Sequence, residues 1–334
     1  AGRDVCRRAV SPETDETRWM CRGYVNGRCV MKEIAGKKVI LTEGEFLRRE
    51  EANKRYLMKL ETPYLLRSYL HEAGRYSGRG PDAEAFGGWE DLSCQLRGHF
   101  LGHWLSAAAL HYQETEDVEL KAKTEVILKE LELCQKDNGG EWVCPIPEKY
   151  LYWIGKGRNI WAPQYNIHKL FMGLIDVYRM MEQPKALSIA DKLADWFYRW
   201  SGRYTREEFD DILDMETGGM VWVWDLYEIT GQEKYKILMQ RYYRSRLFEP
   251  LLEGKDVLTN MHANTTIPEV LGCAKAYEVT GEEKWLHIVE QYWKCAVIDR
   301  GCFATGGQTQ GEIWTPMKKL KARLGDKNQE HCTA

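Results

Sequence analysis

A nine-residue segment occurs twice in this sequence, and it restricts the possible folds more than any other feature. Residues 227–235 read Tyr-Glu-Ile-Thr-Gly-Gln-Glu-Lys-Tyr, and residues 277–285 read Tyr-Glu-Val-Thr-Gly-Glu-Glu-Lys-Trp. In each copy an apolar helical pattern ends at an aromatic residue, a tight glycine turn follows, and a second helical pattern begins. Weaker copies lie at 112–117 and 178–184. A repeat of about fifty residues predicts helical hairpins that stack side by side.

The spacing of apolar residues predicts where the helices lie. We expect a helical stretch that begins at Glu45 and continues to about Tyr69. Later helices are expected at residues 92–113, 117–135, 165–182, 185–201, 217–229, 231–247, 264–279 and 282–297. Long loops at 137–163, 248–262 and 301–316 follow roughly every second helix. Loops collected at one end of the helices favour a closed α/α toroid with a mouth there over an open solenoid, so the predicted fold class is all-α.

The first part of the chain differs from the rest. Residues 1–40 are irregular and charged, and we expect them to carry a short β-hairpin whose arms are 30–34 and 39–41. Residues 41–334 are expected to form one helical domain, which would contain any catalytic site.

Composition excludes several classes of partner. The chain has 47 Lys and Arg residues against 50 Asp and Glu residues, and this formal charge of −3 is too balanced for a nucleic-acid-binding surface. No stretch approaches the roughly 18 apolar residues of a membrane-spanning helix. Thirteen tryptophans suit a pocket whose rings stack on sugars, although most of them are expected to pack in the core. A carbohydrate is therefore one partner that the composition would suit.

Two histidines one helical turn apart are the first candidate site. His99 and His103 stand at i and i+4 and share one face of a helix, as paired zinc ligands do in one class of metalloprotease. That class needs a glutamate directly after the first histidine, and this chain has Phe100 there. The pair can bind a metal, bind substrate hydroxyls or simply pack within the protein, and the sequence leaves all three interpretations open.

Three more candidates stand near the start of a helix. His168 and His262 each follow a long loop, and Glu216 lies in the glycine-containing segment Asp214–Met220. A toroid would present such residues at its mouth. Capping or packing roles are the competing interpretation for each of them.

Carboxylate and thiol side chains near the end of the sequence complete the candidates. Glu312 lies in a glycine-rich loop, where a carboxyl group can be brought into a crowded site. Glu330 and Cys332 are two residues apart, so both can reach one metal ion where the backbone is extended. By itself, a Glu-x-Cys pattern is a weak indication of metal binding.

Taken in order, these motifs resemble glycoside hydrolase family 127 and related families such as family 146, the β-L-arabinofuranosidase-like proteins. The resemblance covers residues 37–334. The residues that carry it are Gly88-Trp89-Glu90, Gly98-His99, Gly102-His103-Trp104-Leu105-Ser106-Ala107, Trp161-Ala162-Pro163, Tyr165, His168-Lys169, Glu216, Gly218-Gly219-Met220, Asn260-Met261-His262-Ala263-Asn264-Thr265, Thr305-Gly306-Gly307, Gly311-Glu312 and Glu330-His331-Cys332.

The resemblance implies an (α/α)6 barrel that removes a terminal β-L-arabinofuranosyl or similar sugar with retention of anomeric configuration. It implies that Glu312 is the general acid/base. The nucleophile of the family is a cysteine thiolate held on zinc by one Glu and three Cys, and Glu330 and Cys332 match the first two of these ligands. Coordination by zinc lowers the pKa of a thiol and so allows it to replace the usual carboxylate.

The resemblance also implies which side chains bind the substrate. His103, His168 and His262 match histidines that hydrogen-bond the sugar. His99, one turn from His103, and Glu216 are further candidates for the same role. Histidines at the starts of helices would fix the furanose hydroxyls, which is a positioning effect.

One departure from the family pattern bears on activity. The nucleophile of the family belongs to an adjacent Cys-Cys pair that lies well downstream of the Glu-x-Cys motif. None of the ten cysteines here has a cysteine neighbour, and Cys273, Cys295 and Cys302 do not align with that role. We therefore expect this chain to be the N-terminal portion of a family member, with a barrel that is truncated on its C-terminal side.

Two other functions stay open on the sequence. A non-catalytic carbohydrate-binding toroid would use the same aromatic residues and histidines without turnover. A sugar epimerase built on an α/α toroid would use paired histidines as acid and base, but it leaves Glu312 and the Glu330 and Cys332 motif unexplained.

The 334-residue chain alone is predicted to be inactive because it lacks a cysteine that aligns with the nucleophile. Incubation with a β-L-arabinofuranoside, followed by chromatographic detection of arabinose, checks this prediction. Measurable release of arabinose would contradict it.

Overall fold

The fold is dominated by α-helices, in agreement with the predicted class. The computed structural model describes residues 24–25, 28–29, 40–75, 86–215, 221–304, 306–323 and 325. Its α-helices are α1 (Glu45–Lys59), α2 (Thr62–Glu72), α3 (His99–Thr115), α4 (Val118–Asp137), α5 (Lys149–Ile154), α6 (Pro163–Met181), α7 (Pro184–Ser201), α8 (Arg206–Met215), α9 (Val221–Thr230), α10 (Glu233–Arg241), α11 (Ser245–Leu252), α12 (Ala263–Thr280) and α13 (Glu283–Trp293). The shorter elements are β1 (Tyr24–Val25), β2 (Arg28–Cys29), η4 (Gly88–Glu90), η5 (Lys294–Ile298), β3 (Thr309–Gln310), β4 (Ile313–Trp314) and η6 (Leu320–Arg323).

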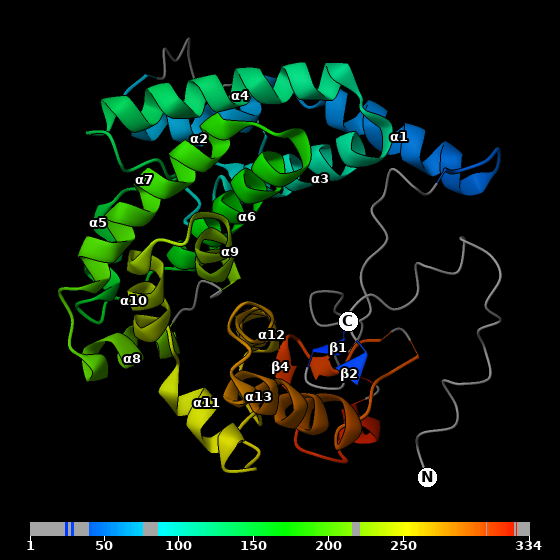
Figure 1. Ribbon diagram of the computed structural model, residues 1–334, viewed down its shortest axis with the longest axis vertical. Coiled ribbons are helices and arrows are strands. Elements are labelled where there is room, and N and C mark those ends of the chain that lie inside the picture. Colours follow the sequence, from blue (N-terminus) through cyan, green and yellow to red (C-terminus); the bar gives the residue numbers. More distant parts are fainter. Residues whose placement is uncertain are drawn as a thin grey trace.

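Pairs of helices follow one another around a curve (Figure 1). Helices α3, α6, α9 and α12 contact each other in that order and form the inner layer. Helices α4, α7 and α10 contact each other in order outside them, and α13 packs on α12. Each inner helix is therefore paired with the outer helix that follows it in sequence, which confirms the predicted stacking of helical hairpins.

The repeated segment forms the turn between the two helices of a hairpin. Gly231 and Gly281 have φ angles of 66° and 70°, and the amide of each donates to the carbonyl of the tyrosine four residues earlier over 2.8 Å. Glu116 and Glu182 occupy the same position after α3 and α6, each with φ of 55°. Glycine adopts this left-handed conformation without steric penalty, so the two strong copies of the repeat contain it. A glutamate there costs about 1 kcal/mol.

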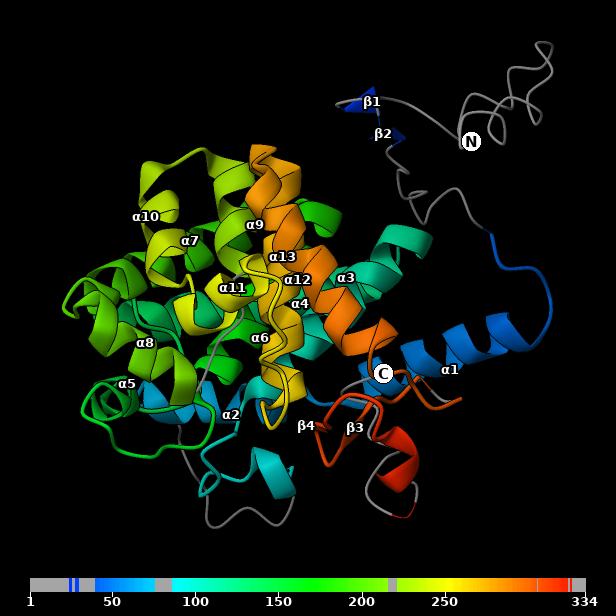
Figure 2. The same ribbon diagram turned by 90° about the horizontal axis from the view of Figure 1, so that it is seen from below.

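The described segments before α3, α6 and α12 gather at one end of the molecule (Figure 2). They are η4, the stretch that contains α5 and the chain before α12, and the β3–β4 hairpin, which follows α13, lies at the same end. The turns after α9 and α12 lie at the other end. The expectation that the long loops collect at one end of the helices is confirmed.

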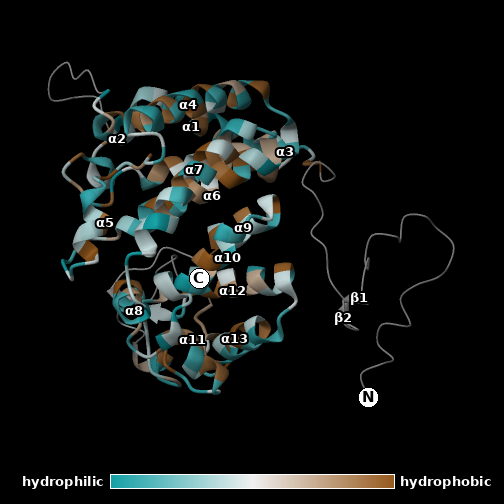
Figure 3. Cartoon of the chain, turned by 60° about the vertical axis from the view of Figure 1, so that its left-hand side comes forward, coloured by the Kyte–Doolittle hydropathy of each residue, from teal (hydrophilic) through white to brown (hydrophobic). Residues whose placement is uncertain are grey.

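The core lies between the inner and outer helices. Figure 3 shows hydrophobic and hydrophilic residues alternating along the helices, as expected of helices that bury one side. Most of the described tryptophans are buried, as expected, and Trp222 stacks on Phe171 with ring centroids 3.9 Å apart. Nowhere in the described ranges does a helix combine the length and the apolar character needed to cross a membrane.

Helices α3 and α6 approach each other closely because both have glycine at the contact. A Cβ atom on Gly102 would clash with the carbonyl group of Lys169, and one on Gly173 would lie 2.6 Å from the carbonyl oxygen of Gly102. No side chain larger than a hydrogen atom fits between the two backbones. This contact fixes the register of the two helices that carry His103 and His168.

The helix predicted at 231–247 is interrupted. The gap between α10 and α11 falls at residues 242–244. There Arg244 donates from Nε to Asp214 over 2.9 Å and from Nη1 to Glu269 over 3.1 Å. The break allows these ion pairs to form, and apolar periodicity alone gives no sign of them.

Other element boundaries also differ from the prediction. The helix expected from residue 92 begins at His99, after Gly98 in the left-handed conformation at φ 78°. Helix α5 lies inside the segment predicted as the loop 137–163. Helix α8 was not predicted, because its apolar residues are few among carboxylates and give a short periodic pattern.

The structure describes only a small part of the predicted N-terminal hairpin. Ile40 and Leu41, which belong to its second arm, are not in a strand, and Ile40 is 86% exposed. The rest of both predicted arms lies outside the described residues. A two-residue ladder forms between β1 and β2, within the N-terminal segment that was expected to carry a hairpin. The sequence between the two strands is Asn26-Gly27, a pair that favours two-residue hairpin turns.

Gly102→Ala is predicted to lower the free energy of unfolding by about 3 kcal/mol, because its methyl group has to push α3 away from the backbone of α6. Urea denaturation followed by circular dichroism measures the change. Gly87→Ala is the matched control, since a Cβ atom there meets nothing within 4 Å, and it should change stability by less than about 1 kcal/mol. Equal stability of the two variants would contradict the close helix contact.

Candidate active site

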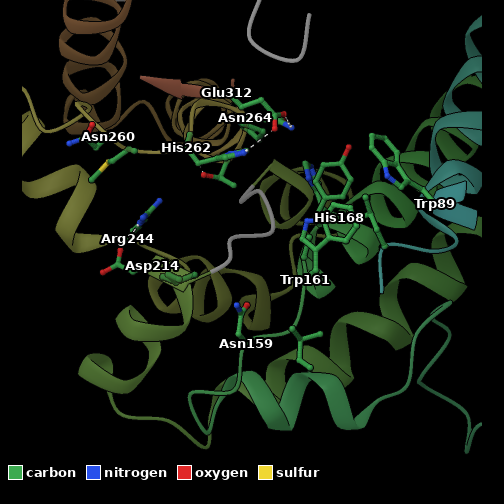
Figure 4. A pocket seen from close by; sticks show the side chains of 18 residues that line it. Trp89, Asn159, Trp161, His168, Asp214, Arg244, Asn260, His262, Asn264 and Glu312 are labelled. Atoms are coloured by element: carbon green, nitrogen blue, oxygen red, sulfur yellow. Dashed lines mark hydrogen bonds and ion pairs between the residues drawn. The ribbon is translucent and has the colours of Figure 1, made fainter. Parts of the chain in front are cut away.

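A pocket of about 550 Å3 opens at the end of the molecule where the long loops gather. It is lined by the loop before α6, the first turns of α6 and α12, the break between α10 and α11, and the β3–β4 turn. Figure 4 shows Glu312, Asn264 and His262 together on one side of it and Trp89 on another. Residues far apart in the sequence therefore meet at one site.

A strained turn presents Glu312. Strands β3 and β4 pair antiparallel, and the two residues between them, Gly311 and Glu312, have φ angles of 55° and 67°. Two positive φ angles are the mark of the tight turn that best fits the twist of a β-hairpin. Glycine accepts this conformation freely, whereas Glu312 is destabilised in it by about 1 kcal/mol. Strain of this kind at an ionisable residue points to a function for the residue.

Strand β4 fixes this turn against the start of α12. The amide of Asn260 donates to the carbonyl of Trp314 over 3.0 Å, and the amide of Ala263 donates to the carbonyl of Glu312 over 2.6 Å. The Trp314 side chain is buried, and its Nε1 donates to Oγ1 of Thr266 over 3.0 Å. The backbone of the acidic residue is therefore held by α12 itself.

A buried arginine ties down the chain on both sides of that hairpin. Arg300 donates from Nε to the carbonyl of Thr315 over 2.7 Å and from Nη1 to the carbonyl of Cys295 over 2.6 Å. Its Nη2 lies 2.8 Å from Oδ2 of Asp256, in the loop before α12. One guanidinium group thus joins three segments, as its planar fork of donors allows.

Two side chains contact the Glu312 carboxyl group. Asn264 donates from Nδ2 to Oε1 over 3.2 Å, and Nε2 of His262 lies 3.4 Å from Oε2. The Glu312 side chain keeps 31% of its surface exposed. The carboxyl group is held in position and can still be reached by a molecule in the pocket.

Two histidines that line the pocket each have a ring nitrogen without a partner among the described residues. His168, in the second turn of α6, is 97% buried and lines the pocket, and its Nε2 makes no hydrogen bond to any described residue. Nδ1 of His262 is likewise buried and unpaired in the described part of the chain. Burial, helped by the positive charge of Lys169, lowers the pKa of His168 to about 3, so its ring is neutral. Unpaired buried nitrogens are costly, and a bound ligand with hydroxyl groups would satisfy them.

His99 and His103 stand beside the pocket on α3. His99 is buried, and its Nδ1 lies 2.8 Å from the carbonyl oxygen of Leu96 and 3.3 Å from Oε1 of Glu90. The ring of His103 lies 5.9 Å from that of His99 at an angle of 89°. Desolvation by the surrounding protein, helped by the positive charge of Lys169, lowers the pKa of His103. Neither histidine is among the residues that line the pocket, so they flank it.

Arg244 is a pocket residue that sequence reasoning missed. It is 93% buried, and its ion pairs with Asp214 and Glu269 neutralise its charge. Asn159 also lines the pocket and was missed. Neither residue belongs to a motif, and only the fold brings them to the site.

Three predicted site residues, Glu216, Glu330 and Cys332, lie outside the described residues. Within the part of the chain that the structure describes, no group of three or more His, Cys, Asp or Glu side chains could hold a metal ion. Zinc binding by Glu330 and Cys332 therefore stays a prediction.

The cysteines that the structure describes do not line the pocket. Burial raises the pKa of the Cys144 and Cys273 thiols well above the usual value and that of Cys134 to about 11. A buried neutral thiol is a poor nucleophile. Cys273, Cys295 and Cys302 are likewise absent from the pocket lining, and the expectation that none of them is the nucleophile stays a prediction.

Comparison with known proteins identifies the family of this chain. The sequence model described as "Beta-L-arabinofuranosidase, GH127 catalytic domain" matches residues 38–334. The chain belongs to glycoside hydrolase family 127. The resemblance found in the sequence motifs is thereby confirmed. No curated protein sequence matches the chain.

Two solved structures are similar to this family 127 domain. One is Ara127N-Se, a GH127 β-L-arabinofuranosidase from Geobacillus stearothermophilus T6, with 19% identity and a TM-score of 0.55 over 81% of this chain and 45% of that one. The other is "The GH127, Beta-arabinofuranosidase, BT3674", with 17% identity and a TM-score of 0.54 over 80% of this chain and 45% of that one. The chain thus spans less than half the length of either relative. At these identities the similarity shows a shared helical fold, consistent with a portion of an α/α toroid.

The burial of His168 predicts a pH dependence of stability. The unfolded chain takes up a proton at this imidazole below pH 6.5, whereas the folded domain does not until about pH 3. The contribution of the neutral His168 imidazole to the free energy of unfolding is therefore fully present above pH 6.5 and is lost as the pH falls toward 3. Between pH 7 and pH 5 the loss is on the order of 2 kcal/mol.

Urea denaturation at pH 7 and pH 5 measures this effect. His168→Gln should remove that part of the decrease, whereas His287→Gln, at an exposed position on α13, controls for loss of an imidazole and should retain it. The same decrease in all three proteins would contradict the assignment to His168.

Proposed function

We propose that this domain binds the terminal β-L-arabinofuranosyl unit of a glycan and supplies the general acid/base for its removal. The observation that carries the proposal is the position of Glu312, which a strained turn presents to the pocket between His262 and Asn264. A carboxyl group kept in place against backbone strain, beside unpaired histidine nitrogens, suits a proton-transfer role.

In a retaining mechanism Glu312 would act twice. It would first donate its proton to the glycosidic oxygen while the bond from that oxygen to the anomeric carbon breaks and the thiolate of a further cysteine bonds to that carbon. It then takes a proton from the water molecule that releases the sugar. Contacts of its two oxygens with His262 and Asn264, at 3.4 and 3.2 Å, would keep the group aligned in both steps.

The remaining polar groups would hold the furanose ring. Nε2 of His168 and Nδ1 of His262, which are buried and lack a partner among the described residues, would bind its hydroxyls. His103, and with it His99 and Glu216, would complete the binding site from α3 and from the segment before α9. Several fixed hydrogen bonds to one small ring orient the anomeric carbon toward the carboxyl group, which is how positioning lowers a barrier.

The proposal also includes parts of the site that rest on the sequence motifs. The curved array of helical hairpins supports an (α/α)6 barrel, to which this chain contributes consecutive hairpins. Glu330 and Cys332 would contribute two ligands to zinc, which when bound would keep the thiol of a further cysteine ionised. A pocket enclosed by loops, rather than an extended groove, suits exo-acting removal of a terminal unit.

The competing function is carbohydrate binding without turnover. It would use the same unpaired histidine nitrogens. The absence of the described cysteines from the pocket lining favours this function, because binding alone needs no nucleophile. The strained position of Glu312 has no purpose in it, since a binding site does not need a proton donor at a costly backbone angle.

Glu312→Gln separates the two functions. In a protein that carries this domain together with the downstream Cys-Cys pair, the substitution should lower hydrolysis of a β-L-arabinofuranoside by about 10²- to 10⁴-fold, because the amide cannot donate the proton. Affinity for methyl β-L-arabinofuranoside, measured by calorimetry, should change by less than about threefold.

Glu290→Gln is the matched control, since Glu290 is exposed on α13 and does not line the pocket. It should leave hydrolysis and binding unchanged. Full hydrolysis by the Glu312→Gln protein would refute the acid/base role. Sugar binding with no turnover by the unsubstituted protein would establish the binding function instead.

A further inference from the structure

Two exposed tryptophans line the pocket, and the proposed chemistry does not use them. Trp89 is 61% exposed and Trp161 is 50% exposed, and both belong to the pocket lining (Figure 4). Their ring centroids are 6.3 Å apart, and the ring planes meet at 84°. Among the described tryptophans, only Trp293 on α13 is comparably exposed. Two large aromatic surfaces left in water beside a polar pocket indicate a binding surface.

Trp89 is held in place by its neighbour in the chain. Glu90, the next residue of η4, accepts hydrogen bonds from the amides of Gly98 and Phe100 over 2.9 and 3.3 Å. These amides belong to the start of α3, where free N–H groups favour a carboxylate. The Trp89 ring also lies 6.0 Å from the ring of His99, which supports it from behind.

Trp161 is fixed by its own backbone. Its amide donates to Oε1 of Gln95 over 2.7 Å, and the carbonyl of Gln95 accepts from Nδ2 of Asn166 over 3.0 Å. Ala162 follows with φ of 51°, a strained angle for alanine, directly before Pro163. The backbone that carries each indole ring is therefore held in place before any ligand arrives.

We infer that Trp89 and Trp161 form a platform for the sugar residue on the leaving-group side of the scissile bond. This inference rests on the proposed function. The C–H face of a sugar ring is apolar and slightly positive, so it packs on the negative face of an indole. Because the two rings meet at a right angle, one can lie under the sugar while the other closes its edge.

The exposure of the polar groups and of the tryptophans supports a site for the terminal sugar inside the pocket and a platform for the next sugar nearer solvent. His168 is 3% exposed and the Glu312 side chain 31%, so these two groups are less exposed than the tryptophans. An exo-acting enzyme places the terminal residue inside its pocket and the next residue nearer solvent. A volume of about 550 Å3 falls in the range that accommodates drug-sized ligands, which leaves room beyond one pentose ring.

Isothermal titration calorimetry on the 334-residue chain tests the platform with two probes. One is methyl β-L-arabinofuranoside, and the other is a disaccharide that carries the same β-L-arabinofuranosyl unit on L-arabinose. We expect the disaccharide to bind roughly tenfold more tightly. Trp89→Ala and Trp161→Ala should each remove most of this gain and leave the affinity for the methyl glycoside within about twofold. Trp161→Phe, which keeps an aromatic face, should retain part of the gain.

Trp293→Ala is the matched control, because it removes an equally exposed indole that does not line the pocket, and it should leave both affinities unchanged. Thermal unfolding of each variant verifies that the domain is folded. Equal affinity for the two probes, or equal loss of both affinities in the Trp89 and Trp161 variants, would overturn the platform and leave the proposed function in place. If neither probe binds, the platform and the proposed function both fail.

Discussion

The arrangement of the pocket depends on the contact between α3 and α6, where glycine on both helices brings the two backbones together. Gly102 precedes His103, and it packs against the backbone of Lys169, the residue after His168. The spacing of the two histidines is thus set by main-chain atoms, which move less than side chains. The tight packing also excludes water from His168, and this burial keeps its imidazole neutral.

A second arrangement brings the acidic residue to the same place. Glu312 owes its position to a hairpin of two-residue strands, which would be unstable in isolation. Hydrogen bonds to the start of α12, the buried Trp314 ring and the fork of Arg300 stabilise it. The strain at Glu312 is offset by these contacts, so the turn persists although its residue disfavours the conformation.

Local sequence signals predicted much of the helical architecture. The repeat around Gly231 and Gly281 identified the hairpin turns because a left-handed cap has a strong residue preference. The sequence could not reveal that Arg244 leaves a helix to pair with Asp214 and Glu269, because the ion pairs join residues 25 and 30 positions away. Long-range contacts of this kind follow from the packing of the hairpins and not from periodicity.

The candidate site, like the fold, could be predicted from the sequence only in part. Motifs singled out His168, His262 and Glu312, and the fold gathers all three around one pocket. No sequence pattern predicts that β4 pairs with the chain before α12, because four strand residues are too few to form a periodic pattern. Trp89 and Trp161 were visible only as parts of motifs, and their mutual geometry depends on separate anchors.

The placement of loops and turns at opposite ends of the helices separates two kinds of sequence change. The turns at Gly231 and Gly281 are far from the pocket, so substitutions there alter the stability of single hairpins. Lengthening or reshaping the loops at the other end changes which ligand the pocket binds. The helical layers tolerate such changes, because each hairpin contacts mainly its neighbours and transmits little strain along the array. Such a scaffold can acquire a different sugar specificity while its helical layers stay the same.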